Sequence, residues 1–493
     1  MINLVLVGAV VVASSETQEE PQERRRLSSD DYHGSKQSIG EIEAWRLGLA
    51  MALVLGLGSL AAGAGIGGGG LFVPIYWLIL DAGAKGAVPL SKATILGGAI
   101  GNFVTIGWAK HPKADRPLID YEAATFMQSG ELLGVVFGVL ANLVLPEVCI
   151  IVFLAVILSY NARRTIRKGF RTRAKENQAL MEASKVLEEE TKDDVVVRAA
   201  SPPGGELEMV ALFDAEEQPN KKSEIAALAD KVRADDARQF PLWAWAQLVP
   251  MTAFLFVYGL LKREVFTPCA TWNAGKHDPL REREGEPHGY AGGVYWLWYW
   301  TPIPVYAGFM ILTAHILKAR TKRREALGDA YAPLPADLKW DDGMLARFPK
   351  VALLAGIAAG LLGIGGGMII GPLFLEIGIE PQVGTSTCAF MILFTATSGV
   401  FLYLFSGNVG WQLALWCVVF GFASGQAGQR GVNYLLKKTG RPSYVIFLLG
   451  AIVASACVAM TISGAVTVAI DASNGKDVFE LTLTEFKCVK GDH

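Results

Sequence analysis

The sequence lacks the short motifs that carry the commonest catalytic and metal chemistry. It contains no P-loop of the form GxxxxGKS/T, no HExxH pair and no GxSxG turn. Its six histidines are scattered, and its six cysteines form no CxxC motif and no metal-ligand spacing with them. We therefore expect no enzyme, no metal site, no cofactor and no pumping driven by ATP hydrolysis in this chain.

Cysteines that could form a disulfide are few. Four of the six lie within apolar runs, where we interpret them as small hydrophobic side chains: Cys149, Cys388, Cys417 and Cys457. Cys269 and Cys488 lie in polar segments and are the predicted disulfide partners if any pair forms. An excess of one charge is lacking too, since 45 basic and 47 acidic residues leave a formal net charge of −2. The distribution of charge along the chain is therefore more informative than its sum.

Apolar residues and glycine, in contrast, are abundant. Hydrophobic residues make up 52% of the chain, its mean hydropathy is +0.33, and several apolar runs are long enough to span a membrane. Glycine accounts for 54 of 493 residues, which suits close packing of helices in lipid. We predict an all-α, multi-pass integral protein of the plasma membrane or an endomembrane. Membrane lipid is an expected partner, and nucleic acid is not.

One apolar run, residues 45–80, is too long for an ordinary membrane span. It contains the sequence GIGGGG at residues 65–70, followed by Pro74. Each glycine costs roughly 1 kcal/mol in a helix interior. Broken backbone survives in lipid only where protein or a water-filled cavity covers it. The run therefore predicts a helix interrupted within the bilayer, with backbone amides free to bind a ligand.

A near copy of this motif occurs in the second half of the chain. Residues 363–367 read GIGGG, and Pro372 follows at the same distance as Pro74 follows the first copy. Paired apolar segments that glycine and proline interrupt are the best sequence indication of a transporter's binding site. The alternative is that these glycines only allow helices to pack closely.

We divide the chain into seven parts. They are a signal peptide (1–15), a polar N-terminal segment (16–44), a first membrane repeat (45–175), an acidic and largely disordered cytosolic linker (176–240), two linking transmembrane helices with an exterior loop (241–324), a second membrane repeat (349–470) and a polar tail (471–493). The apolar start carries no Lys or Arg, so an uncleaved anchor and an unusual start are alternatives to a cleaved signal peptide. The linker is either a tolerated insertion or a site for a protein partner.

Clusters of Lys and Arg predict the orientation of the spans. They lie at residues 110–116, 163–173, 318–324 and 430–441, and such clusters favour the cytosolic side. If all four are cytosolic and the N-terminal region is outside, each interrupted run must turn back or cross twice. The two halves then form inverted repeats, with roughly 10–12 membrane segments in all. Treating each interrupted run as one span gives parallel halves instead, and places the last cluster outside.

Several motifs, in order along both halves, carry a family resemblance. The first half contains GGGGLFVP (67–74), LSKATI (90–95) and HP (111–112) leading to PLIDY (117–121). The second contains GGG (365–367) with Pro372, PQV (381–383) with TST (385–387), and GRPS (440–443). With these motifs the chain resembles the eukaryotic branch of the TauE/SafE family of sulfite and organosulfonate exporters, over residues 45–175 and 240–470.

This resemblance implies a membrane carrier for a small anionic substrate, often a sulfur oxyanion or a sulfonate. It does not fix the substrate, and it brings no established set of binding residues. The alternative function is a membrane receptor or scaffold that acts through the acidic linker and the exterior loop.

A small oxyanion in a bilayer needs hydrogen-bond donors and positive potential. Helices that start after a glycine cluster provide both, through unpaired N–H groups and the helix dipole. We therefore predict a substrate-binding set of backbone amides, hydroxyls and one cation: Gly67, Gly68, Gly69, Gly70, Ser91, Lys92, Thr94, Gly365, Gly366, Gly367, Thr385, Ser386 and Thr387. For the hydroxyl groups, hydrogen bonding between helices is the alternative role.

Two ionisable residues lie within predicted spans. Lys92 lies in the opening turn of a span expected near residues 88–108, where it either contacts the anion or extends to the membrane interface. Glu131 lies in mid-span and is predicted to carry a coupling proton. The family resemblance leads us to expect an apolar residue at that position.

Overall fold

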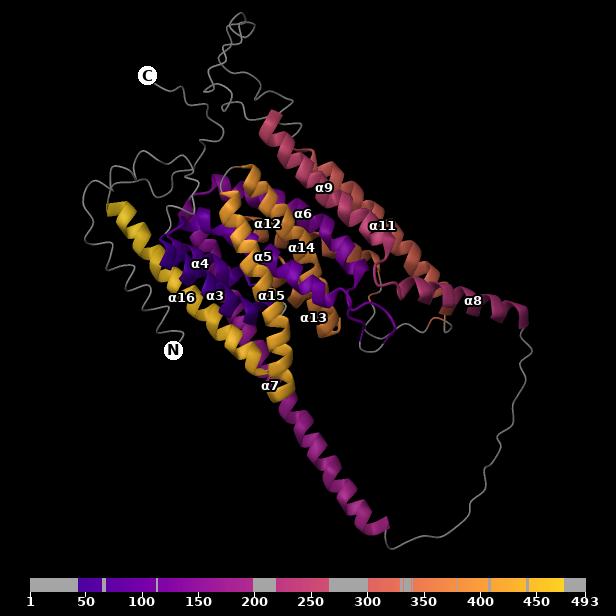
Figure 1. Ribbon diagram of the computed structural model, residues 1–493. Helices are drawn as coiled ribbons and strands as arrows, with labels where there is room; N and C mark the ends of the chain where they lie inside the picture. The colour runs from indigo at the N-terminus through magenta and orange to yellow at the C-terminus, as the bar shows by residue number, and fades with distance from the viewer. Residues whose placement is uncertain are drawn as a thin grey trace, which may run out of the picture.

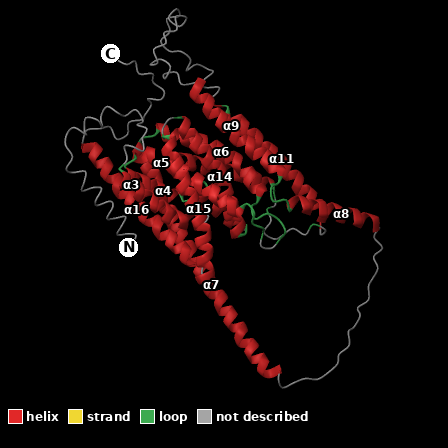
Figure 2. Cartoon of the chain, in the orientation of Figure 1, coloured by secondary structure: helices red, strands yellow, loops and turns green. Residues whose placement is uncertain are grey.

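A computed structural model describes residues 43–63, 68–111, 114–197, 219–265, 300–328, 331, 338, 340–377, 379–406, 409–439 and 443–473 (Figure 1). These residues form thirteen α-helices, and their only β-structure is an isolated bridge between Lys110 and Pro117 (Figure 2). The predicted all-α class is confirmed. The predicted signal peptide, Cys269 and Cys488 lie outside the described residues.

The two halves contain the same order of long and short helices. The first half comprises α3 (Ala44–Gly63), α4 (Gly69–Leu80), α5 (Gly83–Ile106), α6 (Tyr121–Val144) and α7 (Glu147–Val197). The second comprises α12 (Asp342–Leu362), α13 (Gly367–Ile377), α14 (Pro381–Phe405), α15 (Trp411–Thr439) and α16 (Ser443–Ser473). Between the halves lie α8 (Pro219–Asp236), α9 (Leu242–Val265) and α11 (Pro302–Leu327).

Each glycine motif breaks an apolar run into a long helix and a short one. Gly68 precedes α4 with φ of 71°, and Gly363 follows α12 with φ of 65°. Both backbones lie in the left-handed region, which glycine adopts without the steric penalty that a Cβ atom brings. The motifs therefore act as predicted, because they end one helix and allow another to start within the same apolar run.

The first interrupted run turns back on itself. A Cβ atom on Gly58 of α3 would meet the ring of Phe72 in α4, and one on Gly68 would lie 3.5 Å from Ala61. Residues before the break therefore face residues after it in reverse order, as in an antiparallel helix hairpin.

The second interrupted run makes the same reversal. Asn142, near the end of α6, donates a hydrogen bond to the carbonyl of Leu361 at the end of α12 (2.8 Å). Gly366, just before α13, lies back beside Glu131 in the middle of α6. The chain thus reverses direction between Leu361 and Gly366, as the parity of the basic clusters requires.

Equivalent helices of the two halves pack antiparallel. Lys92 of α5 lies against Gly399 of α14, whereas Phe103, further along α5, packs on Phe390, which is earlier in α14 (ring centroids 5.6 Å apart). The same reversed order holds between α7 and α16, in the pairs Ile151–Gly464, Ser159–Cys457 and Glu176–Ser443. The halves are therefore inverted repeats.

The repeats interlock through glycine. Gly134 of α6 and Gly356 of α12 bring these helices so close that a Cβ atom on either would overlap backbone atoms of the other helix. Gly97 of α5 and Gly421 of α15 join that pair of helices in the same way. Small residues at helix contacts are the usual means of close packing in lipid, where no hydrophobic effect drives helices together.

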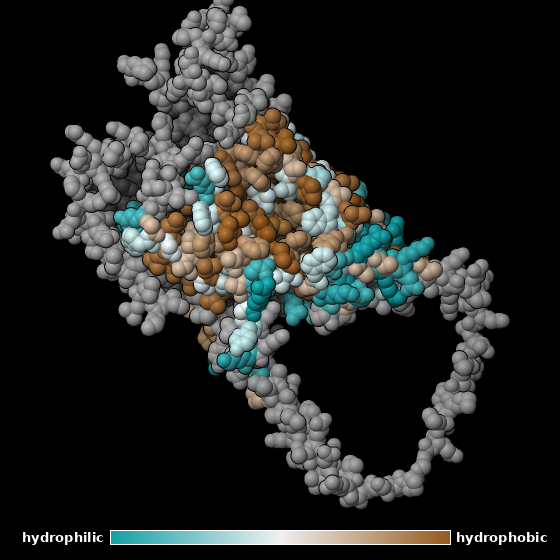
Figure 3. Space-filling model, in the orientation of Figure 1, coloured by the Kyte–Doolittle hydropathy of each residue, from teal (hydrophilic) through white to brown (hydrophobic). Residues whose placement is uncertain are grey.

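The helix surfaces fit a membrane environment. Seven helices of the described part are long and apolar enough to cross a membrane: α3, α6, α7, α9, α11, α12 and α14. The short helix α4 is apolar as well. Figure 3 shows hydrophobic side chains over much of the bundle, and hydrophilic side chains gathered near α8.

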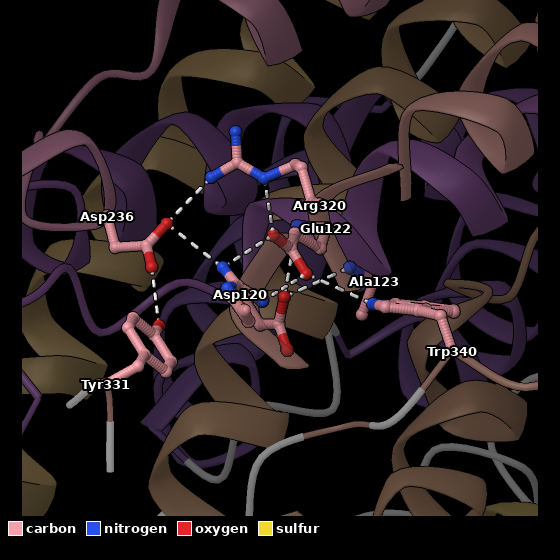
Figure 4. A network of polar contacts seen from close by, with 8 residues as sticks. Asp120, Glu122, Ala123, Asp236, Arg320, Tyr331 and Trp340 are labelled. Carbon is pink, nitrogen blue, oxygen red and sulfur yellow. Dashed lines mark hydrogen bonds and ion pairs between the residues drawn. The ribbon is translucent and has the colours of Figure 1, made fainter. Parts of the chain in front are cut away.

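Charged side chains join α6, α8 and α11 at one end of the bundle. Arg320 and Arg324 of α11 bond Glu122 in the first turn of α6, and both also bond Asp236 at the end of α8 (Figure 4). Arg116 lines a pocket at the same end together with Arg320 and Arg324, and we call this end the basic end. The positive-inside rule predicts that it faces the cytosol.

The acidic segment 176–240 differs from the expected disordered linker over two stretches. Helix α7 continues as far as Val197, and α8 covers Pro219–Asp236. Residues 174–190 are rich in Ala, Glu, Lys and Leu, which have high helix propensity. The bundle also provides an already formed helix from which α7 can extend, so the costly nucleation step is avoided.

Candidate functional site

The two glycine motifs lie against each other. A Cβ atom on Gly69 would fall 2.6 Å from Ile364 Cα and 2.7 Å from the Gly365 nitrogen. The Ser91 hydroxyl of α5 donates to the carbonyl of Gly363 (2.8 Å) and lies 3.5 Å from that of Gly69. Ser91 therefore links both motifs at the contact between the repeats.

The short helices α4 and α13 begin at this contact. Gly68 precedes α4, Gly69 and Gly70 open its first turn, and Gly367 is the first residue of α13. The first N–H groups of any helix have no acceptor within that helix, and they carry the positive end of its dipole. Both helices thus start where a bound anion would be stabilised. Gly67 lies outside the described residues.

Lys92 is fully buried near the middle of α5. Its Nζ has no hydrogen-bond partner among the described residues. Its aliphatic chain passes Gly399 of α14, where a Cβ atom would lie 3.3 Å from Lys92 Cδ. The expected position in an opening turn is wrong, because α5 begins at Gly83 and continues through Pro89. A side chain with no exposed surface does not extend to the membrane interface.

Glu131 lies near the middle of α6 and is also fully buried. Neither carboxylate oxygen has a hydrogen-bond partner in the described part of the chain. The carboxylate lies where a side chain on Gly366 would be, so the glycine of the second motif provides its space. The charges of Glu131 and Lys92 interact across the helices.

Four neutral polar residues accompany this pair, and the sequence analysis did not identify them. They are Thr125, Gln128, Thr395 and Ser398, all nearly or fully buried. The Gln128 amide donates to the Thr395 hydroxyl across the contact of α6 and α14 (3.2 Å). The sequence signal was present, because in an apolar helix Thr125, Gln128 and Glu131 recur at the spacing of one helix face.

Thr94 takes part in packing between helices. Its hydroxyl donates to the carbonyl of Leu90 (3.0 Å) and pairs with the hydroxyl of Tyr76 in α4. This is the alternative role considered for the hydroxyl residues, namely a polar contact between helices.

The hydroxyl residues of the second half do not join the glycine contact. Thr385 and Thr387 lie in the first turns of α14, where each donates to a carbonyl of its own helix. The Thr387 hydroxyl also accepts the N–H of Asp120 (3.0 Å). At about 1.5 Å per residue, Thr387 lies about 12 Å along α14 from Thr395. Thr385, Ser386 and Thr387 therefore lie near the start of α14, away from the glycine contact.

A charged pocket opens at the basic end, below the buried pair. It is lined by residues that include Asp120, Tyr121, Glu122, Arg324 and Val383. Burial and the neighbouring charge of Glu122 raise the pKa of Asp120 to about 6. Asp120 also caps α6, because its carboxylate accepts the N–H groups of Glu122 and Ala123 (3.0 Å each).

Two inverted repeats around a buried polar site, with helices broken at their contact, are the architecture of a membrane transporter. The family model described as "Sulfite exporter TauE/SafE" matches residues 4–196 and 289–472, and the chain belongs to this family.

Relatives from Arabidopsis thaliana agree with this assignment. "Sulfite exporter TauE/SafE family protein 2" is 29% identical over 423 residues, covering 83% of this chain and 81% of the relative. "Family protein 3" is 28% identical over 388 residues, covering 78% and 72%. "Family protein 5" is 28% identical over 411 residues, covering 83% and 81%. No solved structure matches the chain.

Proposed function

We propose that this protein is a secondary carrier of small anions, most simply sulfite, a sulfonate or a related sulfur oxyanion, and that it works by alternating access. The observation that carries the proposal is the contact of the two glycine motifs beside a fully buried lysine and glutamate. Neither Lys92 nor Glu131 has a hydrogen-bond partner among the described residues.

Burying Lys92 and Glu131, which lack hydrogen-bond partners in the part of the chain that the structure describes, is unfavourable for folding. A buried charge without hydrogen bonds loses several kcal/mol of solvation. Ionisable residues at membrane depth are therefore rare, and they commonly mark the path of a substrate or a proton. An anion at the glycine contact, next to Ser91, would accept hydrogen bonds from Lys92 Nζ and from the first backbone amides of α4 and α13.

Glu131 supplies the coupling in this proposal. Lys92 and Glu131 are neutral as a pair, and the arrival of a monoanion adds one negative charge to a buried site. Protonation of Glu131 restores neutrality, so the anion and a proton would move together. The names of the Arabidopsis relatives describe those proteins as sulfite exporters, which supports sulfite as the first substrate to test.

The test is uptake of labelled sulfite by the purified, full-length protein in liposomes, with a trapped pH indicator to follow protons. We expect uptake that an opposing proton gradient reduces. Glu131→Gln should abolish proton movement and retain exchange of sulfite for sulfite. Absence of uptake of both sulfite and a simple sulfonate by folded protein would exclude the proposal.

A further inference from the structure

One face of α6 carries polar residues from the basic end as far as the middle of the bundle. Tyr121, Thr125, Gln128 and Glu131 follow one another at spacings of four, three and three residues. Residues three or four apart are neighbours on a helix surface. All four side chains are buried, with exposed fractions between 0% and 4%.

Helix α14 faces this row in register. Asp120 bonds Thr387 and Gln128 bonds Thr395, and each pair is 267 residues apart in sequence. The two helices therefore run parallel, and the same offset places Ser398 level with Glu131. Polar side chains of the two helices therefore lie in register along the contact between them, and we call this line of side chains the polar groove.

Several polar atoms in this groove have no protein partner. Within the described residues, no hydrogen bond reaches Thr125 Oγ1, Gln128 Oε1, Ser398 Oγ or either oxygen of Glu131. Buried polar groups are almost always satisfied, by protein or by water. Because each internal water molecule makes about three hydrogen bonds, a row of such atoms is suited to hold water.

The half of α6 that follows Glu131 is apolar at its buried positions, which include Leu132, Val135 and Val139. The next polar side chain, Asn142, is occupied by its bond to Leu361. The polar groove therefore reaches Glu131 from one side only.

On that side lies the charged pocket of the basic end, whose lining residues include Tyr121 and Val383. Tyr121 is both the first residue of the polar row and part of the pocket wall. Apart from the row itself, two ionisable groups face Glu131, namely Lys92 of α5 and the thiol of Cys388 in α14. The turn before α13 contributes only the backbone of Gly366.

We propose that the groove between α6 and α14 holds a chain of water molecules that carries protons between the pocket at the basic end and Glu131. A hydronium ion in the pocket passes its proton along Thr125, Gln128 and Thr395 to the Glu131 carboxylate, and water remains behind. The proposal rests on the proposed coupling role of Glu131, and it adds the route and its sidedness.

The test follows Glu131 directly and needs no anion transport. In full-length protein in liposomes, the carboxyl C=O stretch of Glu131 is identified by its loss in Glu131→Gln. The growth of this absorbance band, which reports protonation of Glu131, is then followed in time after a jump from alkaline to acidic pH. Thr125→Val and Thr395→Val should each slow the rise about tenfold, since each removes roughly one hydrogen-bonding link from the chain.

Two matched variants control for the loss of a hydroxyl. Ser129 donates to the carbonyl of Phe126 and Thr397 to that of Leu393, as Thr395 does to that of Met391. Thr395 also accepts the amide of Gln128, whereas within the described helices no hydrogen bond joins Ser129 or Thr397 to a side chain of the row. Ser129→Ala and Thr397→Val should leave the rate within about twofold of the wild type. In oriented vesicles, Thr125→Val should slow the response to a pH jump at the basic end and leave the response to a jump at the opposite end unchanged, because the row leads to Glu131 from the basic end.

Three results would overturn the route: no band assignable to Glu131, unchanged rates in both path variants, or equal slowing by Thr125→Val of the responses from both ends. Failure of sulfite uptake would instead contradict the proposed function, and would leave these rates as they are. The two failures are therefore distinguishable.

Discussion

Lys92 and Glu131 are the residues on which the account depends most. Each is fully buried near the middle of its helix, and each lies beside a glycine that leaves room for it, Gly399 and Gly366 respectively. Two opposite charges in one occluded site keep it neutral when empty. In the proposed carrier, a transported anion contacts the Lys92 cation, and a proton neutralises the Glu131 carboxylate.

The role of Lys92 can be tested by removing its charge. Lys92→Gln should lower the initial rate of sulfite uptake at least about tenfold, because one charge-assisted interaction with the anion is lost. Lys85→Gln is the control, since Lys85 lies at the start of α5 and donates to the carbonyl of Leu143 (3.2 Å). Equal rates for Lys92→Gln and the wild type would remove Lys92 from the binding site.

Gly366 provides a second test at the same place. A Cβ atom there would overlap a carboxylate oxygen of Glu131, so Gly366→Ala should displace the carboxylate and abolish proton-coupled uptake. Gly371→Ala is matched to it, because a Cβ atom at Gly371 would make an ordinary 3.7 Å contact with Cys388 Sγ. Size-exclusion profiles of both variants in detergent would separate loss of coupling from misfolding. Normal coupling in Gly366→Ala would show that the position of Glu131 is not restricted.

The sequence predicted the residue types at this site better than their places. The glycine motifs, Ser91, Lys92 and Glu131 come together, whereas Thr385–Thr387 lie near the basic end. The span was expected from about residue 88, whereas α5 begins at Gly83 and accommodates Pro89 within the helix. The positions of Thr125 and Ser398 depend on the register of α6 with α14, which no local pattern reports.

Between helices, close contacts at glycine and ion pairs at the basic end determine how α6 packs against its neighbours. Helices α6 and α12 approach through Gly134 and Gly356, whose missing side chains allow backbone contact. At the basic end, Glu122 and Asp236 hold α6, α8 and α11 together through Arg320 and Arg324, and Trp340 adds a bond to Glu122 (3.1 Å) (Figure 4).

Gly134→Ala should destabilise the protein by about 1–3 kcal/mol, because overpacking forces the backbones of α6 and α12 apart. Gly48→Ala serves as the control, since nothing lies within 4 Å of a Cβ atom there. That exposed helical position should gain about 0.5–1 kcal/mol. Thermal unfolding of both variants in detergent measures the difference. Equal midpoints would contradict the close contact of α6 with α12.

Asp120 should make stability depend on pH. Its pKa is about 6 in the folded protein and 3.8 ordinarily, so the folded state binds the proton more tightly. The wild type should therefore lose stability as the pH rises from about 4 to about 6, on the order of 1 kcal/mol or more. Asp120→Asn keeps an oxygen to cap α6 and removes this dependence.

The measurement is the unfolding midpoint of wild type and Asp120→Asn in detergent at a series of pH values. We expect Asp120→Asn to be more stable than the wild type above pH 6, and equal to it below pH 4. Parallel curves over that interval would show that Asp120 is not a buried, titrating cap.

At the scale of the whole molecule, most of the architecture was predictable. Two glycine motifs with matched prolines predicted the broken helices, and the basic clusters predicted the inverted repeats. The helix breaks at Gly68 and Gly363 confirm the first prediction. The antiparallel packing of α5 with α14 and of α7 with α16 confirms the second. The interlocking of α6 with α12 was not predictable, because glycine spacing alone does not say which helix lies opposite.

In the proposed mechanism, the two repeats carry an anion by exposing one site to each side of the membrane in turn. Counter-transport tests this claim most directly, in liposomes that hold the full-length protein and are loaded with labelled sulfite. Unlabelled sulfite added outside should accelerate the exit of the label, because a loaded carrier returns to the inner face faster than an empty one. An exit rate that outside sulfite leaves unchanged, together with single-channel currents, would contradict the carrier and indicate a pore.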